Sequence, residues 1–282
     1  MTDKPLLTIE DLKVSFPTRK GLVEAVRGIS LSLGREKLGI VGESGSGKSL
    51  TGRSILRLVP KPGVVTAGRL EFDGVDLQRA SEAQMREIRG QRISMVMQDP
   101  KFSLNPVMRV GEQIAEAYRT HQKVPQAEAR RRALDMLAAV RIRDPERVYR
   151  AYPHEVSGGM GQRIMIAMML IPDPDLLIAD EPTSALDVTV QLQVLAILDD
   201  LVTQRGMGLV FISHDLNLVA SFCDRVVIMY AGRVMEVCDA KNLAAAQHPY
   251  TRGLLNCLPS IDGDGRDLPV LKRDPAWMEH GL

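Results

Sequence analysis

The sequence predicts an α/β protein with a parallel core sheet. In the second half of the chain, short apolar runs alternate with helical stretches, which is the pattern of βαβ units. An earlier apolar run leads directly into a glycine-rich turn and then into a helix. The composition, 45% hydrophobic and 25% charged, is that of a folded globular chain, and 282 residues suffice for one large or two small domains.

The first 35 residues predict antiparallel strands, because apolar and polar side chains alternate there. The run 37–41 predicts a buried strand, and 50–59 predicts the helix after the glycine-rich turn, ended by Pro60 and Pro62. Five further short runs predict strands: 69–72, 93–97, 176–179, 208–212 and 225–229.

The period of the sequence changes to that of helices between about residues 99 and 172, with helices predicted over 110–118 and 127–140. We interpret 99–172 as a helical subdomain inserted into a main domain that spans 1–240. The pattern weakens after residue 240, so 241–282 is interpreted as a C-terminal tail.

Charge and cysteine content exclude several classes of protein. There are 36 basic and 35 acidic residues, a net charge of +1, so we expect no nucleic-acid partner. Three cysteines without a close pair argue against a disulfide framework and are too few for an iron–sulfur cluster. The N-terminus has no secretory pattern, and the longest strongly apolar stretch, 164–171, is too short to cross a bilayer. We expect a soluble chain, or one held at a membrane by a partner.

Residues 42–49 read Gly-Glu-Ser-Gly-Ser-Gly-Lys-Ser and fit the phosphate-loop pattern G-x-x-x-x-G-K-[ST] between a strand and a helix. Glycines let backbone N–H groups turn inward around a phosphate, and the helix N-terminus adds a favourable dipole. Lys48 would place its charge on the β- and γ-phosphate oxygens, and the Ser49 hydroxyl would hold Mg²⁺. A glycine–serine turn unrelated to phosphate is the alternative. The predicted nucleotide-binding residues here are Gly42, Glu43, Ser44, Gly45, Ser46, Gly47, Lys48, Ser49 and Leu50.

An apolar strand that begins at residue 176 ends in two carboxylates, Asp180 and Glu181. Asp180 is predicted to hold Mg²⁺ through water, together with Ser49. Glu181 is then predicted to orient and polarise the attacking water. A buried strand that ends at an acidic turn is also a common structural feature, so the phosphate loop upstream is what favours the catalytic interpretation.

A second candidate anion site is Ser157-Gly158-Gly159-Met160, which opens a predicted helix. The structural alternative is an N-cap serine in a glycine turn. One nucleotide rarely needs two phosphate-binding helix starts on one chain. The pair makes sense if two subunits sandwich the nucleotide and each contributes one face.

These motifs, in this order, resemble the nucleotide-binding subunits of ABC transporters over nearly the whole chain. The resemblance implies a P-loop NTPase cassette with a mixed or parallel core sheet, an N-terminal antiparallel β-subdomain and an inserted α-helical subdomain. It also implies roles for four more residues. Gln98 resembles the Q-loop glutamine that touches Mg²⁺ and the membrane subunits, and Asp187 the D-loop aspartate that links the two sites of a dimer. His214 resembles the switch histidine at the γ-phosphate, and Phe16 the aromatic that stacks on adenine.

A closer resemblance is to the oligopeptide/dipeptide/nickel importer subfamily. It rests on three stretches: 98–106, with Gln-Asp-Pro and then Ser-Leu-Asn-Pro; 154–160, His-Glu-Val-Ser-Gly-Gly-Met; and 248–251, His-Pro-Tyr-Thr. It implies a second, non-identical ATP-binding subunit, two membrane permeases and an extracytoplasmic solute-binding protein as partners. The chain would then lie at the cytoplasmic face of the inner membrane, and 241–282 would be a tail of the peptide-importer type.

The expected activity is ATP hydrolysis, with Mg²⁺ as cofactor and Glu181, His214 and Gln98 as catalytic residues, coupled to import of di- or oligopeptides. Nickel or another small solute stays open as the cargo. A soluble ABC ATPase that acts on DNA or ribosomes is an alternative of a different class, but it predicts basic extensions, coiled-coil insertions or tandem cassettes, and the sequence has none of these. A P-loop kinase or GTPase is disfavoured by Ser157-Gly158-Gly159 and by His214.

Overall fold

The computed structural model describes residues 4–97, 103–184, 186–257, 271, 273–279 and 281. The chain divides into two compact units. The first unit combines residues 1–79 with 210–282, and the second unit comprises residues 80–209.

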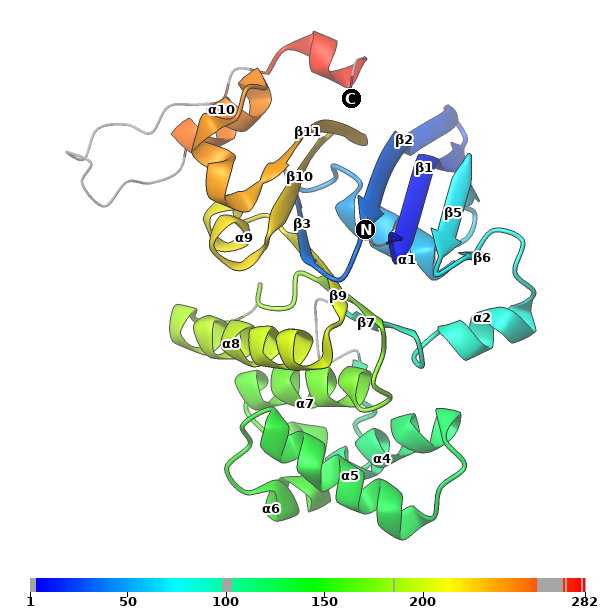
Figure 1. Ribbon diagram of the computed structural model, residues 1–282, viewed down its shortest axis with the longest axis vertical. Coiled ribbons are helices and arrows are strands. Elements are labelled where there is room, and N and C mark those ends of the chain that lie inside the picture. Colours follow the sequence, from blue (N-terminus) through cyan, green and yellow to red (C-terminus); the bar gives the residue numbers. More distant parts are fainter. Residues whose placement is uncertain are drawn as a thin grey trace, which may run out of the picture. The chain divides into compact units, whose positions relative to one another are not determined.

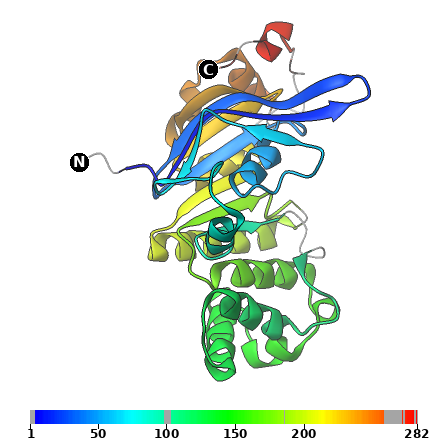
Figure 2. The same ribbon diagram turned by 90° about the vertical axis from the view of Figure 1, so that its right-hand side faces the viewer.

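An antiparallel sheet opens the first unit. Strands β1 (Leu7–Thr18) and β2 (Gly21–Leu33) form a long hairpin, which is the extended blue ribbon in Figure 2. Buried and more exposed residues alternate along much of β1, as the sequence pattern predicts. The register shifts between Ile9 and Leu12, where Asp11 adopts a left-handed φ of 50°. The predicted antiparallel strands are therefore present, with a bulge that the alternation does not reveal.

Three short strands complete this sheet. Two of them, β4 and β5, pair antiparallel with β1, and β6 pairs with β5. Figure 1 shows β1, β2 and β5 side by side. Their bounds are Val64–Thr66 for β4, Arg69–Phe72 for β5 and Val75–Asp76 for β6.

A second sheet in the first unit has mixed strand directions. Strand β3 (Lys37–Gly42) runs parallel to β10 (Arg225–Tyr230), which pairs antiparallel with β11 (Arg233–Asp239). All residues of β3 after Lys37 are buried, as expected for a central strand. Strand β9 (Gly208–Ser213), also fully buried, begins in the second unit and continues in the first.

Helix α1 (Lys48–Ile55) follows the glycine-rich turn, but the bounds predicted from the sequence, 50–59, are wrong at both ends. The helix starts directly after Gly47, whose left-handed φ of 97° makes the turn. It ends at Ile55, ahead of Pro60, because Arg57 adopts a left-handed φ of 53° that an α-helix cannot continue through. The proline is therefore not what stops the helix.

The C-terminal part of the chain holds more regular structure than the weakening sequence pattern predicts. Helix α9 (Leu216–Phe222) precedes β10, as the predicted alternation of strands and helices requires. After residue 240, where the pattern weakens, the 3-10 helix η2 (Ala240–Ala245) and helix α10 (Pro249–Asn256) follow β11. A last 3-10 helix, η3 (Pro275–Met278), is drawn in red near the C-terminus in Figure 1. Most of the Pro-rich stretch 259–275, expected as a surface tail, lies outside the described residues.

The second unit contains a pair of parallel strands and a group of helices. Strand β7 (Ile93–Val96) pairs in parallel with β8 (Leu176–Asp180), and both are fully buried. Helices α4, α5, α6 and α7 contact one another, and they are the green group in Figure 2. In the described residues, the helices of this unit are α2 (Glu82–Ile88), α4 (Val110–His121), α5 (Gln126–Ala139), α6 (Pro145–Arg150), η1 (Pro153–Glu155), α7 (Gly158–Leu170) and α8 (Val188–Arg205).

Within the described part of the chain, we find no helix with the length and apolar character needed to cross a membrane.

The three cysteines differ in burial, which predicts a difference in reactivity. Cys223 is buried, and burial raises the pKa of its thiol to about 12, whereas Cys238 and Cys257 are half-buried. The thiolate is the reactive form. We expect Ellman's reagent at pH 8 to modify Cys223 only after unfolding in denaturant. Cys223→Ser should remove only that late signal, and reaction of all three thiols at one rate in the native protein would contradict the assignment.

Candidate functional site

The phosphate loop, residues 42–49, connects β3 to α1 and is shaped by close backbone packing. A Cβ atom on Gly42 would lie 2.1 Å from the Met229 carbonyl oxygen, and one on Gly47 would lie 2.8 Å from the Ala25 carbonyl oxygen. Gly45 and Gly47 also have left-handed φ values of 81° and 97°. Space or backbone conformation therefore requires glycine at each of these three positions.

Lys48 is buried at the start of α1, with 5% of its surface exposed. Its ammonium group donates hydrogen bonds to the carbonyl oxygens of Gly42, at 2.7 Å, and Glu43, at 2.8 Å. The cation therefore lies inside the curve of the loop. Because these carbonyl oxygens are neutral, an anionic oxygen would be a stronger acceptor.

Two hydroxyl groups of the loop, those of Ser46 and Ser49, fit a triphosphate with its metal ion. Ser46 is 3% exposed, and its hydroxyl has no hydrogen-bond partner among the described residues. Ser49 is half-buried in the first turn of α1, where its hydroxyl is a hard oxygen donor of the kind Mg²⁺ prefers. Thr51 closes the turn by donating to the Gly47 carbonyl oxygen at 3.0 Å. The loop thus offers a buried hydroxyl, a buried cation and a helix N-terminus to one anionic group.

The acidic strand end belongs to the second unit. Asp180 is the last residue of β8 and is 3% exposed, so its carboxylate is a hard oxygen ligand held on a buried strand. Glu181 follows with a left-handed φ of 46°, a strained conformation for a residue with a side chain. The Ser184 hydroxyl donates to the Glu181 carbonyl oxygen at 3.2 Å and closes the turn.

The Ser-Gly-Gly-Met stretch opens α7 as the sequence predicts. Ser157 is the N-cap, and its hydroxyl accepts a hydrogen bond from the Met160 N–H at 3.3 Å. Ser157 and Gly158 are exposed, so the first turn of this 13-residue helix faces solvent. The observed role of Ser157 is therefore the structural one, and its use toward a phosphate stays a prediction.

Two predicted site residues, Asp187 and Gly159, both lie next to Val190 in the first turn of α8. Asp187 is the N-cap of this helix and accepts from the Val190 N–H at 3.0 Å. A Cβ atom on Gly159 would lie 2.6 Å from Cγ1 of the same Val190. The absence of a side chain at position 159 lets the first turns of α7 and α8 approach closely.

Three predicted site residues remain to be placed: His214, Phe16 and Gln98. His214 is exposed directly after β9, and Asp215 caps α9 by accepting from the Leu218 N–H at 3.0 Å. Phe16 is half-buried on β1, opposite Val23. Gln98 falls outside the described residues, so its predicted role is not tested.

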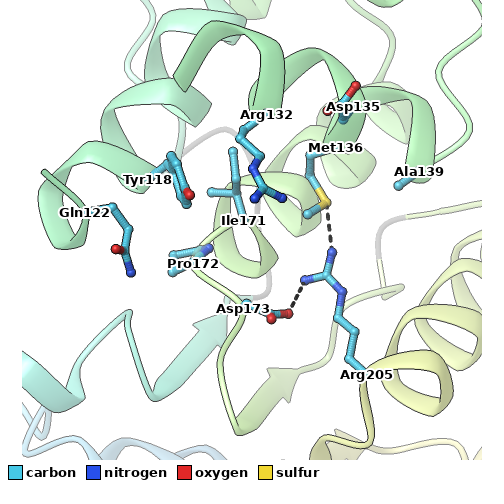
Figure 3. A pocket seen from close by; sticks show the side chains of 10 residues that line it. All are labelled: Tyr118, Gln122, Arg132, Asp135, Met136, Ala139, Ile171, Pro172, Asp173 and Arg205. Atoms are coloured by element: carbon cyan, nitrogen blue, oxygen red, sulfur yellow. Dashed lines mark hydrogen bonds and ion pairs between the residues drawn. The ribbon is translucent and has the colours of Figure 1, made fainter. Parts of the chain in front are cut away.

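A cavity of about 570 Å³ lies among the helices of the second unit, and it contains none of the predicted site residues. Arg205 enters it and pairs with Asp173 at 3.0 Å, while its other nitrogen lies 3.8 Å from the Met136 sulfur (Figure 3). Arg132 stacks over the Tyr118 ring, 5.9 Å from its centroid. Both cations of this cavity are engaged by neighbouring side chains.

Sequence reasoning missed one contact with the phosphate loop. Arg273, in the C-terminal segment, donates to the Glu43 carboxylate at 3.0 Å. The two residues are 230 positions apart, so no local pattern predicts the pair. The single tryptophan, Trp277, in an otherwise polar stretch was the available signal that this segment packs against something.

Comparisons with a family model, with known sequences and with solved structures agree with one another. A family model described as ABC transporter matches residues 26–184. A probable peptide ABC transporter ATP-binding protein of Sinorhizobium fredii is 52% identical over 257 residues, which cover 90% of this chain and 77% of that protein. A dipeptide transport ATP-binding protein of Bacillus subtilis is 47% identical over 273 residues, 96% of this chain and 82% of that protein.

Among solved structures, the chain is similar to a dimeric ATP-binding cassette in a post-hydrolysis state bound to ADP and Pi. The TM-score is 0.73 at 26% identity, over 83% of this chain and 99% of that chain. This likeness confirms the predicted fold class: α/β, with an antiparallel sheet, a mixed or parallel sheet and several helices.

The two glycines of the α7 start provide a matched pair for a stability test. Gly158→Ala should leave the free energy of unfolding unchanged or raise it slightly, because a Cβ there meets nothing within 4 Å. Gly159→Ala should lower it by about 1–3 kcal/mol, because the added atom collides with Val190. Urea unfolding of both variants checks this, and equal stabilities would contradict the close approach of α7 and α8.

Proposed function

The chain belongs to the ABC transporter family, and on that premise we propose that it is the ATP-hydrolysing subunit that energises a peptide importer. The observation that carries the proposal is the phosphate loop, with its sterically required glycines and the buried Lys48 inside its curve. The names of its relatives, a peptide and a dipeptide transport ATP-binding protein, support a peptide cargo.

Lys48 binds the triphosphate by exchanging partners. Its ammonium group leaves the carbonyl oxygens of Gly42 and Glu43 for the β- and γ-phosphate oxygens, which are stronger acceptors because they are charged. The backbone N–H groups of the loop and the α1 N-terminus add their donors to the same oxygens. Phe16 stacks on the adenine.

Ser49, Asp180 and Gln98 are the residues that would hold Mg²⁺. A hydroxyl, a carboxylate and an amide group supply hard oxygen donors. That is the pattern of Mg²⁺, which binds one or two carboxylates together with phosphates and water. Bound there, the ion neutralises charge that develops on the phosphate oxygens.

Glu181 orients and polarises the attacking water, and His214 and Gln98 hold the geometry of the γ-phosphate. The strained backbone at Glu181 and the Ser184 bond to its carbonyl oxygen support this role, because such strain persists where a site fixes a side chain. Catalysis of this kind works by positioning and charge stabilisation.

A second ATP-binding subunit, a non-identical homologue, completes the site. In this proposal Ser157, Gly158, Gly159 and Met160 cap the nucleotide of the partner, and Asp187 links the two sites. The dimeric form of the similar cassette and the solvent-facing start of α7 support the arrangement. Dimer closure drives two permeases that receive solute from an extracytoplasmic binding protein, so the chain acts as a peripheral protein at the cytoplasmic face of the inner membrane.

The catalytic role of Glu181 predicts a separation of binding from turnover. Glu181→Gln should bind ATP as the wild type does, because the phosphate loop is intact. Its kcat should fall by about 10²- to 10⁴-fold, because the water-orienting carboxylate is lost. A coupled phosphate-release assay measures the rate, and wild-type turnover would refute the role.

The cargo is tested by uptake in cells that lack this subunit. Restoring the wild-type chain should restore uptake of labelled di- or oligopeptides, whereas Lys48→Ala, which lacks the phosphate-binding cation, should not. Restored uptake of Ni²⁺ without peptide uptake would reassign the cargo. Restored uptake of neither would contradict the proposal.

A further inference from the structure

The C-terminal segment Arg273–Glu279 is attached to the first unit at both ends. Its Arg273 side chain pairs with Glu43 of the phosphate loop at 3.0 Å. The Met278 carbonyl oxygen accepts from Arg27 at 3.2 Å and from Arg233 at 3.1 Å. Between these anchors, Asp274 caps the short helix of the segment by accepting from the Ala276 N–H at 2.9 Å. The segment is therefore tied down on either side of its helix.

An aromatic cluster fills the space between these anchors. Trp277 packs against Tyr230, Tyr250 and His248, with ring centroids 5.7 to 6.2 Å apart. Tyr250 lies in α10 and is fully buried, and its ring centroid is 4.7 Å from that of Tyr230 at the end of β10. Such aromatic pairs add to the stability gained by burial.

The cluster reaches the phosphate loop through Tyr250. Burial and the negative charge of Glu43 raise the pKa of the Tyr250 hydroxyl, while Arg273 acts in the opposite direction. The side chains of Glu43 and Arg273 therefore lie close enough to Tyr250 to interact with its hydroxyl electrostatically. Glu43 is also the residue whose carbonyl oxygen accepts from Lys48 at 2.8 Å.

We propose that the segment Arg273–Glu279 braces the phosphate loop, and that Arg273 is a positioning residue for ATP that holds the Glu43 carboxylate and offsets its charge. The inference rests on the proposed function, because it concerns how the same loop binds ATP. The Arg273–Glu43 pair would favour ATP binding in two ways. A loop held in place loses less freedom on binding, and a neutralised carboxylate repels the triphosphate less.

The test compares Arg273→Gln with Arg252→Gln in the full chain. Arg252 is an exposed arginine of α10 for which the described residues provide no ion-pair partner, so it controls for loss of a tail charge. The Kd of AMP-PNP, measured by calorimetry at low salt, should rise about two- to fivefold in Arg273→Gln, the range of a partly exposed ion pair. Arg252→Gln should bind as the wild type does. The KM for ATP should rise in Arg273→Gln with kcat unchanged.

A dependence of the loss on charge would distinguish this role from a merely structural one. The loss should be smaller for ADP than for AMP-PNP, should shrink at high salt, and should be largely rescued by Arg273→Lys. In a Glu43→Gln background, Arg273→Gln should cause no further loss. An equal loss for every nucleotide, or an unchanged Kd for AMP-PNP, would overturn the inference. A wild-type chain that binds no AMP-PNP would instead overturn the proposed function, and the role of Arg273 with it.

Discussion

The position of the Lys48 ammonium group is the constraint on which the rest of the first unit depends. A buried cation needs acceptors, and the loop supplies two of its own carbonyl oxygens. That arrangement requires a tight turn, which requires the absence of side chains at Gly42 and Gly47. The strand before the loop and the helix after it fix the ends of the turn, so the mixed sheet serves to hold one charge in place.

The second unit shows the same principle at two helix starts. Ser157 caps α7 and Asp187 caps α8, and Gly159 lets the two first turns approach through Val190. The capping bonds are local, but the approach of the helices places both N-termini in one small region. In the proposed function, this region caps the nucleotide of the partner subunit.

The parts of the site that can be predicted from the sequence are those with local physical causes. The loop at 42–49 is recognisable because one short stretch must supply the glycines, the lysine and the helix start. The end of α1 at Ile55 could not be predicted, because a left-handed turn at Arg57, a residue with no preference for that conformation, ends the helix early. The Arg273–Glu43 pair joins distant segments, which packing around Trp277 and the hydrogen bonds to the Met278 carbonyl oxygen bring together.

The most direct measurement is a crystal structure of the chain with Mg²⁺ and a nonhydrolysable ATP analogue. Phosphate oxygens should lie inside the loop, within hydrogen-bond distance of the Lys48 ammonium group, which should have left the carbonyl oxygens of Gly42 and Glu43. An analogue bound elsewhere, with Lys48 still on those two carbonyl oxygens, would contradict the role assigned to this buried charge.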